Sequence, residues 1–518
     1  MFRLLILLFI PLYLFAGEFK VASYNVENLF DAVKNGTEYE DYVPGRHNWS
    51  EHMVDIKLTH LSEVICDLDA DIVALQEIEN EGILTRLQKR LKRVGCDYPY
   101  HSIARKKKTT IRVALLSRYP ITDEREIRVN YSSRDRDILE VTVKIEKEPL
   151  TLFVNHWKAK SRSGFESRRM NYAKALAKRI DALPKGREYL IIGDLNSHYD
   201  EYRVLTKRLN DTQGKTGINH ILKTIRGENL VSEEEMPAES EGHHFNLWLE
   251  LAPAKRWSHK YYGHRGSIDH ILLPQTLFDG KGIDYVNNSY GVFRAPYLFT
   301  REGWINGWDY SGSKHKGRGY SDHLPIYATF SMRPYQPEKV KKAVLQKIED
   351  LYRVEQLDHP IKLENCVVVL KRGSNAIIKQ SSKGKAIYVY AAAAGLQEGE
   401  RYDLTVSEIA TYKGLKEIMR IEKIKKRGSV ALHPYYMQED QLDSRDPAQQ
   451  NQVFVDLIGT YRHNHFEIGK RRIPIYFKKK RNRPADGSKL KISYAHLGYY
   501  RKAQLIVYDR KDFQEMEK

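Results

Sequence analysis

The pattern of apolar and polar positions from Phe19 to Phe330 predicts strands that alternate with helices. Short apolar runs of strand character are separated by segments in which apolar residues recur every three or four positions. The predicted strands cover FKVASYNVE, DIVALQEIE and residues 113–117, 138–145, 150–156, 189–193 and 324–330, and the predicted helices cover 55–68, 84–94 and 166–182. This mixture favours an α/β core in which helices cover a sheet.

The pattern changes after Ser331. The stretch MRPYQPEKVKKAVLQKIEDLY is bounded by prolines and amphipathic, and it predicts a connecting helix within 332–357. Over 358–430, strand-like runs such as CVVVL, AIYVY and YDLTVSEIATY are separated by Gly and Lys turns, which predicts a small β-barrel. A weaker echo over 450–518, with Tyr412-Lys413 matched by Tyr500-Arg501, predicts a second module that arose by tandem duplication.

The N-terminus has the shape of a secretory signal. In MFRLLILLFIPLYLFAGE, Arg3 precedes an apolar run that ends at Phe15, and small residues follow. A buried strand or a short membrane anchor is the alternative, but the run does not alternate and no second hydrophobic segment follows. We therefore expect export with residues 1–17 removed, to the periplasm or the outside of a bacterium; Leu14 leaves the cleavage point open.

Composition and cysteine content narrow the class of protein. The chain has 518 residues, 41% hydrophobic and 29% charged, which predicts several folded domains and excludes a disordered chain. Lys and Arg exceed Asp and Glu by 85 to 67, so the surface should attract polyanions, either nucleic acid or anionic lipid. Cys66, Cys96 and Cys366 lack metal-ligand spacing and allow at most one disulfide; whether Cys66 and Cys96 are bridged stays open.

Polar side chains occur at the ends of many of the predicted strands. Taken singly they have ordinary explanations: Asn25 as a turn cap, Glu77 as an exposed strand end, and Asp194 with Asn196 as an Asx-turn. Their joint occurrence has no structural reason in a folded protein. The set comprises Asn25, Glu77, Asn155, His156, Asp194, Asn196, Asp269, His270, Asp322 and His323. Oxygen ligands and histidines without cysteine favour Mg²⁺, Mn²⁺ or Ca²⁺, and predict metal-assisted hydrolysis of a phosphoester.

The stretch IIGDLNS shows how one strand could deliver two such groups. Gly193 has no side chain, so it leaves space around the backbone at the strand end. The intervening Leu195 points away, so Asp194 and Asn196 share one face toward the scissile phosphate.

Seven motifs in order resemble those of the endonuclease/exonuclease/phosphatase superfamily, the deoxyribonuclease-like group. They are SYNVENL, LQEIEN, ALLSRYPI, NHWKAKS, GDLNS, SIDHILL and SDHLPI. The resemblance implies a four-layer α/β sandwich over 18–331, with two packed sheets flanked by helices. It implies metal ligation by Asn25, Glu77 and Asp322. It also implies that Asp194 orients or deprotonates the attacking water and that Asn196 contacts the phosphate.

The resemblance also assigns the histidines. Asp269 would hold the imidazole of His323, which stabilises developing charge or shuttles a proton. His156 would be a second phosphate-facing imidazole, although the acid that steadies it in several relatives has no counterpart in this sequence. His270 follows the matched Asp269 and, by strand alternation, should point to the opposite face of the sheet. It is therefore not counted among the site residues.

Three features favour nucleic acid, DNA first, as the substrate. They are the basic net charge, the aromatic and basic segment RAPYLFTREGWINGWDYSGSKHKGRGY, and C-terminal modules that resemble the OB-fold modules of secreted bacterial nucleases. The segment could equally be a packed loop, and KKKRNRP at 478–484 a solvated one rather than a phosphate-binding turn. Candidate substrate contacts are Arg118, Trp304, Trp308, Lys314, Lys316 and Arg318.

Two other functions stay open at this point. Phe299, Trp304 and Trp308 could touch a lipid interface in a phospholipid or sphingomyelin phosphodiesterase, although no exposed apolar hairpin is evident. A noncatalytic nucleic-acid scaffold is disfavoured because every matched catalytic position is intact. For a nuclease, the resemblance implies products with 5′-phosphate ends. The sequence gives no oligomeric state.

Overall fold

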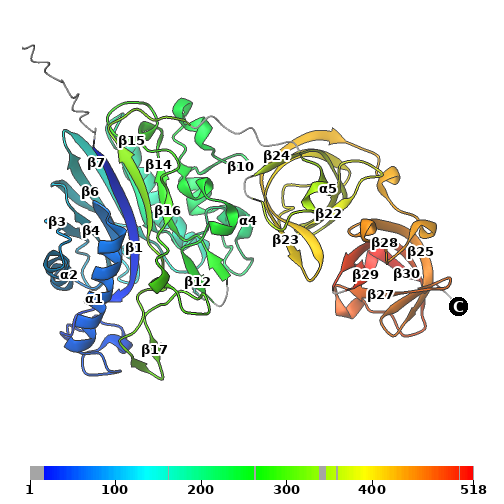
Figure 1. The fold of residues 1–518 in the computed structure, drawn as a ribbon, viewed down its shortest axis with the longest axis horizontal. Coiled ribbons are helices and arrows are strands. Elements are labelled where there is room, and N and C mark those ends of the chain that lie inside the picture. The colour runs from blue at the N-terminus through cyan, green and yellow to red at the C-terminus, as the bar shows by residue number, and fades with distance from the viewer. Residues whose placement is uncertain are drawn as a thin grey trace, which may run out of the picture. The chain divides into compact units, whose positions relative to one another are not determined.

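The computed structural model describes residues 17–161, 163–261, 264–337, 346–357, 360–500 and 502–516 (Figure 1). They divide into two compact units, which are described separately. The first unit contains the chain to 225 together with 231–251 and 256–338, and the second contains 226–230, 252–255 and everything from 339 onward. Apart from Gly17, the predicted signal segment lies outside the described residues.

The first unit contains two large sheets. One has the strand order β15-β19-β1-β2-β4-β3, with β16 beside β19, and the other has the order β11-β14-β8-β7-β6-β5. The strands of the first sheet are β1 Glu18–Leu29, β2 Ile72–Ile78, β3 Tyr100–Ile103, β4 Arg112–Ser117, β15 Asp284–Tyr285, β16 Gly291–Val292 and β19 Ile326–Ser331. Those of the second are β5 Ile121–Ile127, β6 Ile138–Ile145, β7 Glu148–His156, β8 Tyr189–Asp194, β11 Phe245–Asn246 and β14 Asp269–Leu273. Strands β1 and β2 contact β8, so the sheets pack face to face.

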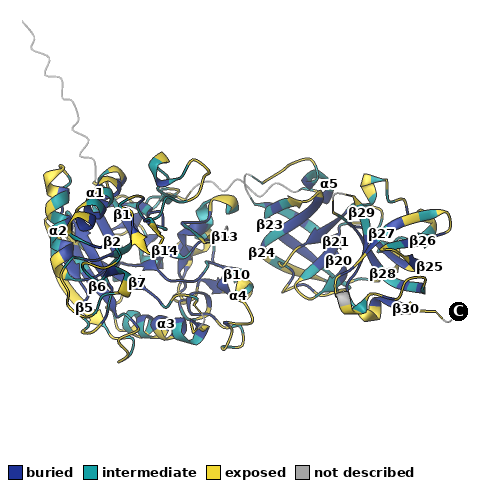
Figure 2. Ribbon diagram, turned by 90° about the horizontal axis from the view of Figure 1, so that it is seen from below, coloured by how far each residue is buried: buried dark blue, intermediate teal, exposed yellow. Residues whose placement is uncertain are grey.

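Helices cover the outer face of each sheet. Helices α1 Glu51–Leu68 and α2 Glu81–Arg93 pack Leu61, Ile65 and Leu87 against the first sheet. Helix α3 Glu166–Asp181 and the π-helical turn Gly217–Ile221 pack against the second. In Figure 2, α1 and α2 lie along the top and left of this unit and α3 along its lower edge. The predicted four-layer α/β sandwich is therefore confirmed.

Most predicted elements agree with the structure to within a few residues, but several short or edge strands escaped prediction, among them β5 and β3. Strand β5 reads ITDEREI and lies at a sheet edge with its central residues exposed, so it has no apolar run to reveal it. The four-residue edge strand β3 is too short to show a period.

The first unit carries one disulfide. Cys66, near the end of α1, is bonded to Cys96, which follows α2, and it closes a span of 30 residues. Cys366 is a buried free thiol in the second unit. The pairing left open by the sequence is thus Cys66 with Cys96.

The second unit is built from two small barrels. The first is closed, with the order β20-β21-β22-β24-β23, and the second has the order β25-β26-β27-β29-β28-β30 with a further pairing of β25 with β28. Their strands are β20 Ile361–Arg372, β21 Asn375–Lys379, β22 Ala386–Val389, β23 Glu400–Tyr412, β24 Leu415–Ser429, β25 Val453–Arg462, β26 His465–Ile468, β27 Arg471–Phe477, β28 Lys489–Tyr499, β29 Ala503–Val507 and β30 Phe513–Glu515. The prediction of small all-β barrels is confirmed, and their likeness to OB-fold modules stays a prediction.

The two barrels repeat one topology. In each, the third and fifth strands pair in parallel, β22 with β24 and β27 with β29, and the remaining pairings are antiparallel. This agrees with the predicted duplication. The matched Arg501 lies outside the described residues.

The predicted connecting helix can be compared with the structure only at its two ends, because residues 338–345 lie outside the described residues. Residues 332–337 are irregular, and the described helix in this stretch, α5, covers only Ile348–Leu351. Ile348 and Leu351 are buried in the core of the first barrel, and this contact accounts for the amphipathic pattern at that point. In the described part of the chain, no helix is both long and apolar enough to cross a membrane.

Candidate active site

Three of the predicted site residues lie side by side across the second sheet. Asp194 ends β8, where it pairs with His156 of β7 on one side and with Asp269 of β14 on the other. Gly193 occupies the preceding row, at φ 127°. A Cβ there would clash with the backbone oxygen of Asn155 on β7, so only glycine allows this approach. Strand pairing therefore brings together residues that are far apart in sequence.

The first sheet supplies Asn25 and Glu77 through an irregular edge. Sequence reasoning placed Glu77 at a strand end, but β2 continues to Ile78 and Glu77 is a bulged residue with φ 70°. The register of β1 against β2 also shifts after Asn25. Bulges of this kind turn a side chain out of the regular alternation and are common beside active sites. The bulge aims the Glu77 carboxylate toward Asn25.

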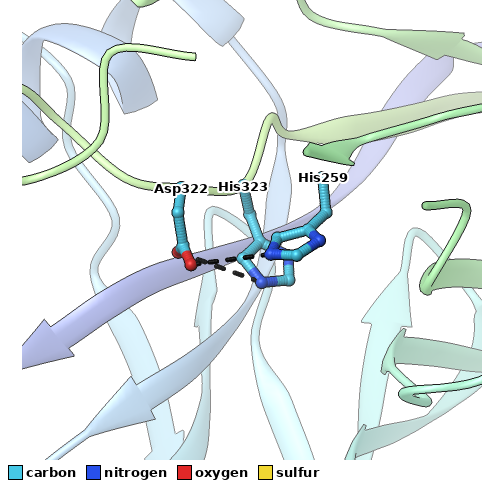
Figure 3. Close-up of side chains that lie close together, drawn as sticks. All are labelled: His259, Asp322 and His323. Atoms are coloured by element: carbon cyan, nitrogen blue, oxygen red, sulfur yellow. Dashed lines mark ion pairs between the residues drawn. The ribbon is translucent and has the colours of Figure 1, made fainter. Parts of the chain in front are cut away.

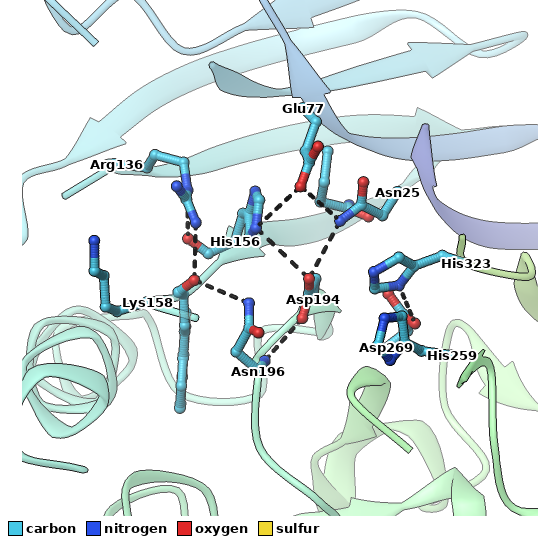
Figure 4. A network of polar contacts seen from close by, with 12 residues as sticks. Asn25, Glu77, Arg136, His156, Lys158, Asp194, Asn196, His259, Asp269 and His323 are labelled. Carbon is cyan, nitrogen blue, oxygen red and sulfur yellow. Dashed lines mark hydrogen bonds and ion pairs between the residues drawn. The ribbon is translucent and has the colours of Figure 1, made fainter. Parts of the chain in front are cut away.

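Four polar groups from the two sheets converge (Figure 4). The Asn25 amide donates from Nδ2 to Glu77 Oε1 and to Asp194 Oδ2, both at 3.2 Å. His156 Nε2 lies 3.7 Å from Glu77 Oε1 and 3.6 Å from Asp194 Oδ2. Two carboxylates, an amide and an imidazole therefore face one another across the space between the sheets.

Asn196 reaches this centre by a different route from the one expected. Strand β8 ends at Asp194, and Asn196 has φ 47°, so the strand alternation does not extend to it. Its backbone N–H donates to Asp194 Oδ1 at 2.8 Å, which is the Asx-turn considered as the ordinary explanation. Its side chain donates from Nδ2 to the Trp157 carbonyl at 3.1 Å. The turn, rather than a shared strand face, holds Asn196 beside Asp194.

A second cluster surrounds His323 (Figure 3). His323 Nδ1 lies 2.8 Å from Asp269 Oδ2, which also accepts from Ser258 Oγ at 2.5 Å. His323 Nε2 lies 4.0 Å from Asp322 Oδ1. The ring of His259, from strand β12 His259–Tyr261, lies 4.6 Å from that of His323, and its Nε2 is 3.6 Å from Asp322 Oδ2.

The environment separates the protonation states of these groups. Burial, and then the negative charge of Asp269, raise the pKa of Asp194 to about 7. Burial lowers the pKa of His156 well below its ordinary value, and Arg136 adds to the effect. Burial also disfavours the charged form of His323, but Asp269 and Asp322 outweigh it and raise its pKa well above the ordinary value. The centre therefore holds a neutral His156, a cationic His323 and a carboxyl that titrates near neutrality.

Several residues next to this centre were not predicted from the sequence, among them Glu27, Lys57 and His259. Glu27 accepts from the backbone N–H of Asp322 at 2.8 Å and of Trp308 at 2.9 Å, and so positions the Asp322 loop. Lys57 is buried in α1, with its Nζ 4.6 Å from the Trp308 ring. Glu27 lies in the motif SYNVENL, so the sequence contained a signal for it. His259 and Lys57 lie in no motif, and no local sequence pattern indicates them.

The structure brings together only part of the candidate substrate-binding set. Arg118 pairs with Asp69 at 2.6 Å and Asp71 at 3.1 Å, at the opposite end of β2 from Glu77, so it does not reach the centre. Trp308 is 4% exposed and donates from Nε1 to His315, which makes it part of the packing beneath the site. Trp304 is 48% exposed, with Lys260 Nζ 3.8 Å from its ring centre.

The remaining candidates lie on a surface hairpin and its continuation. Lys314 belongs to strand β18 Lys314–His315, paired with β17 Tyr310–Ser311 (Figure 1). Lys316 and Arg318 are also exposed, and Arg318 pairs with Asp309 at 2.7 Å. Closer to the centre, Arg136 donates to the carbonyls of His156 and Trp157 (Figure 4). Arg136 is thus a basic group beside the site that the sequence analysis did not name.

The donor set fits a divalent cation. Carboxylate and amide oxygens of Asn25, Glu77 and Asp322 are hard ligands of the kind that Mg²⁺ and Mn²⁺ prefer. Burial and the nearby Asp322 charge raise the pKa of Glu77, so a cation would relieve like-charge crowding. His259, Asp322 and His323 also offer ligand atoms close to one another, as do Asp194, Asp269 and His323.

These features define the class of protein. The sequence model of the Endonuclease/Exonuclease/phosphatase family matches residues 20–332, more than half of the chain, and the chain belongs to this family. Members of the family are hydrolases that act on phosphoester bonds and use divalent metal ions. No curated protein matches the chain.

Several solved structures are similar to about 60% of the chain. Truncated TDP2 of Caenorhabditis elegans is 15% identical, covers 61% of this chain and 98% of its own, and has a TM-score of 0.34. TDP2 of D. rerio in complex with a single-strand DNA product is 14% identical over 61% and 99%, with a TM-score of 0.38. Beta toxin 275-280 from Staphylococcus aureus is 16% identical over 60% and 99%, with a TM-score of 0.38. These likenesses concern the fold and carry no argument about substrate.

Proposed function

We propose that the protein is an exported, divalent-metal-dependent nuclease that hydrolyses phosphodiester bonds of nucleic acid, with DNA as the favoured substrate. The observation that carries this proposal is the convergence of Asn25, Glu77, His156 and Asp194 beside the Asp269–His323 pair. Two sheets meet there and bring carboxylates, an amide and two imidazoles into one site. Such an arrangement serves the in-line attack of water on phosphorus.

Each group has a role that its environment supports. Asp194, with a pKa of about 7, accepts the proton of the attacking water at its carboxylate. His323, kept protonated by Asp269, directs its Nε2 proton at a phosphoryl oxygen and stabilises the charge that develops there. Neutral His156 and the Asn196 side chain orient the phosphate. A cation held by Asn25, Glu77 and Asp322 supplies charge neutralisation on the phosphoryl oxygens when bound.

Charge and the disulfide support the choice of polymer and compartment. The net charge of +18 favours a polyanionic substrate. The Cys66–Cys96 disulfide suits an oxidising compartment outside the cytoplasm, in keeping with the signal-like N-terminus. The lipid alternative loses support because Trp308, one of its three interfacial aromatics, is buried.

The test is to incubate the purified mature chain with plasmid DNA, with RNA and with sphingomyelin, and to measure hydrolysis of each substrate in Mg²⁺ and in a chelator. We expect loss of DNA with Mg²⁺ only, with 5′-phosphate product ends. Asp194→Ala and His323→Ala should each lower the rate by roughly 100- to 10,000-fold. Arg118→Ala, which removes a basic side chain at the other end of β2, is the matched control and should cut at the wild-type rate.

Three results decide against the proposal. Cleavage of sphingomyelin without cleavage of nucleic acid would make the protein a lipid phosphodiesterase. Full activity in the chelator would remove the metal from the reaction. Tight binding of DNA without any hydrolysis would leave the noncatalytic scaffold.

A further inference from the structure

The second unit contains a cavity of about 820 Å³ where the two barrels meet. This volume falls within the range of roughly 300–1,000 Å³ that is usual for ligand pockets. Seven tyrosines line it, together with Lys478, Glu417 and His496. The tyrosines are Tyr388, Tyr390, Tyr412, Tyr476, Tyr499, Tyr500 and Tyr508.

The floor of the cavity is fixed by contacts across the two barrels. His496 is fully buried and stacks on Tyr388 with ring centres 5.3 Å apart. Its Nδ1 lies 2.9 Å from the Tyr508 hydroxyl and its Nε2 lies 2.8 Å from Asn451 Oδ1. Asn451 in turn donates to the Lys416 carbonyl of the first barrel at 3.0 Å. The cavity is therefore bounded by a rigid polar network.

The rim is aromatic and exposed. Beyond residue 346, the exposed aromatic side chains that the structure describes are Tyr390, Tyr412, Tyr476 and Tyr500, and all four line this cavity. The rings of Tyr412 and Tyr500 lie 6.4 Å apart, and Lys413 Nζ is 5.0 Å from the Tyr500 ring centre. Exposed aromatics gathered at one opening indicate a binding surface, because packing alone would bury them.

Both walls are alike because the two barrels repeat one topology. Tyr388 of β22 pairs with Glu417 of β24, and at the corresponding place in the second barrel Tyr476 of β27 pairs with Ile506 of β29. Each barrel thus contributes the same parallel strand pair. Each also contributes a tyrosine from the end of its fourth strand: Tyr412 is the last residue of β23, and Tyr500 directly follows β28. The cavity exists only because the module is present twice.

The surrounding charge points to a polyanion. Residues 361–518 contain 31 lysines and arginines and 18 aspartates and glutamates, so they carry 13 of the 18 net positive charges of the chain. Glu417 is the one carboxylic acid in the lining, and burial raises its pKa to about 7. At neutral pH its negative charge is therefore only partly present and repels a polyanion less. Aromatic platforms among cations are the combination that stacks bases and contacts backbone phosphates in single-strand binders.

We infer that the tyrosine-lined cavity binds unpaired bases of a single nucleic-acid strand, with the phosphates held by lysines such as Lys413 and Lys478 at its edge. This inference deepens the proposed nuclease function and rests on it for the identity of the polymer. The module pair would hold a single-stranded part of the substrate, separately from the hydrolytic centre.

The test is fluorescence anisotropy with a labelled oligothymidylate and the full mature chain carrying Asp194→Ala, in a chelator. We expect the double variant Tyr412→Ala/Tyr500→Ala to lose roughly 10-fold or more in affinity, since each lost stacking platform weakens binding by about 5- to 150-fold. Tyr412→Phe/Tyr500→Phe keeps the rings and should bind like the parent. Tyr100→Ala, an exposed tyrosine of the first unit, is the matched control and should also bind like the parent.

An abasic oligonucleotide of equal length separates bases from phosphates. We expect it to bind the parent chain about as weakly as oligothymidylate binds the double alanine variant. Equal affinity for both oligonucleotides, or an unchanged affinity in the double alanine variant, overturns the inference.

Binding is measured without hydrolysis, so the two proposals fail separately. A chain that shows the expected binding pattern but cuts no nucleic acid overturns only the nuclease. A chain that cuts DNA while its double alanine variant binds normally overturns only the base-binding cavity.

Discussion

The negative charge of Asp269 raises the pKa values of two groups, His323 and Asp194, to which the proposal assigns opposite roles. Its negative charge is the largest favourable influence on protonated His323, and after burial it is also the largest cause of the raised pKa of Asp194. One carboxylate thus keeps the acid charged and delays ionisation of the base. Asp269 therefore raises the pKa values of both groups to which the proposed mechanism assigns acid–base roles.

Replacement of Asp269 should therefore move the whole pH profile. In the proposed mechanism activity requires ionised Asp194 and protonated His323, so it should rise as pH passes about 7 and fall as pH passes the raised pKa of His323. In Asp269→Asn both groups lose a negative neighbour, both pKa values fall, and both limbs should shift to lower pH. The measurement is kcat/KM for a small phosphodiester over about pH 5 to 10.

Ser258→Ala is the matched control for this shift. It removes only the Ser258 hydroxyl that donates to Asp269 and leaves the negative charge in place. Its profile should stay close to that of the wild type. An Asp269→Asn profile that loses height but keeps both limbs in place would contradict the assigned roles.

Strand β8 can carry Asp194 to the centre only because Gly193 lets β7 come close. Gly193→Ala would place a methyl group against the Asn155 backbone oxygen, in a backbone conformation that side chains rarely adopt. We expect it to lower the free energy of unfolding by about 3 kcal/mol or more. All six tryptophans lie before residue 309, so their fluorescence in urea reports on the first unit alone.

Gly186→Ala separates the two causes. Gly186 also has a positive φ, 75°, but no atom lies within 4 Å of the position a Cβ would take. Gly186→Ala should lower the free energy of unfolding by only about 1–2 kcal/mol, the cost of holding a residue with a Cβ at positive φ. Equal losses in the two variants would mean that the close approach of β7 and β8 contributes nothing.

The regular elements explain what the sequence could predict. His156, Asp194 and Asp269 follow apolar runs with clear periods, and they meet because their strands are neighbours in register. Glu77 was identified by its motif, but its bulge depends on the pairing of β2 with both neighbours, which no local pattern encodes.

Positions outside the long strands were harder to predict. His259 lies in a three-residue strand and reaches Asp322 only through tertiary packing. Trp308 looked like a surface platform because basic residues surround it in sequence, yet it packs over Lys57 from α1. Local composition indicates which side chains are available, whereas long-range contacts decide which become buried.

The distribution of site residues and of net charge suggests that the two units have different functions. The hydrolytic centre belongs entirely to the first unit, whereas residues 361–518 carry 13 of the 18 net positive charges. The first unit also has its own buried cores under α1, α2 and α3. We therefore expect it to fold and hydrolyse without the barrels, and to lose mainly its attraction for a long polyanion.

A chain of residues 18–337 tests this division. Its kcat on a small diester such as bis(p-nitrophenyl) phosphate should match that of the full mature chain, because such a substrate has no polymer to hold. Its KM for single-stranded DNA should be about 10-fold or more higher at low salt, and should rise less steeply with salt, because fewer cations displace counterions from the strand. The difference between the two KM values should narrow at high salt, where the electrostatic part of binding is screened, and the part contributed by stacking on the barrel tyrosines should remain. An equal KM for both chains at low salt would mean that the barrels do not hold the substrate, since the charge they add could then have no part in recruiting it.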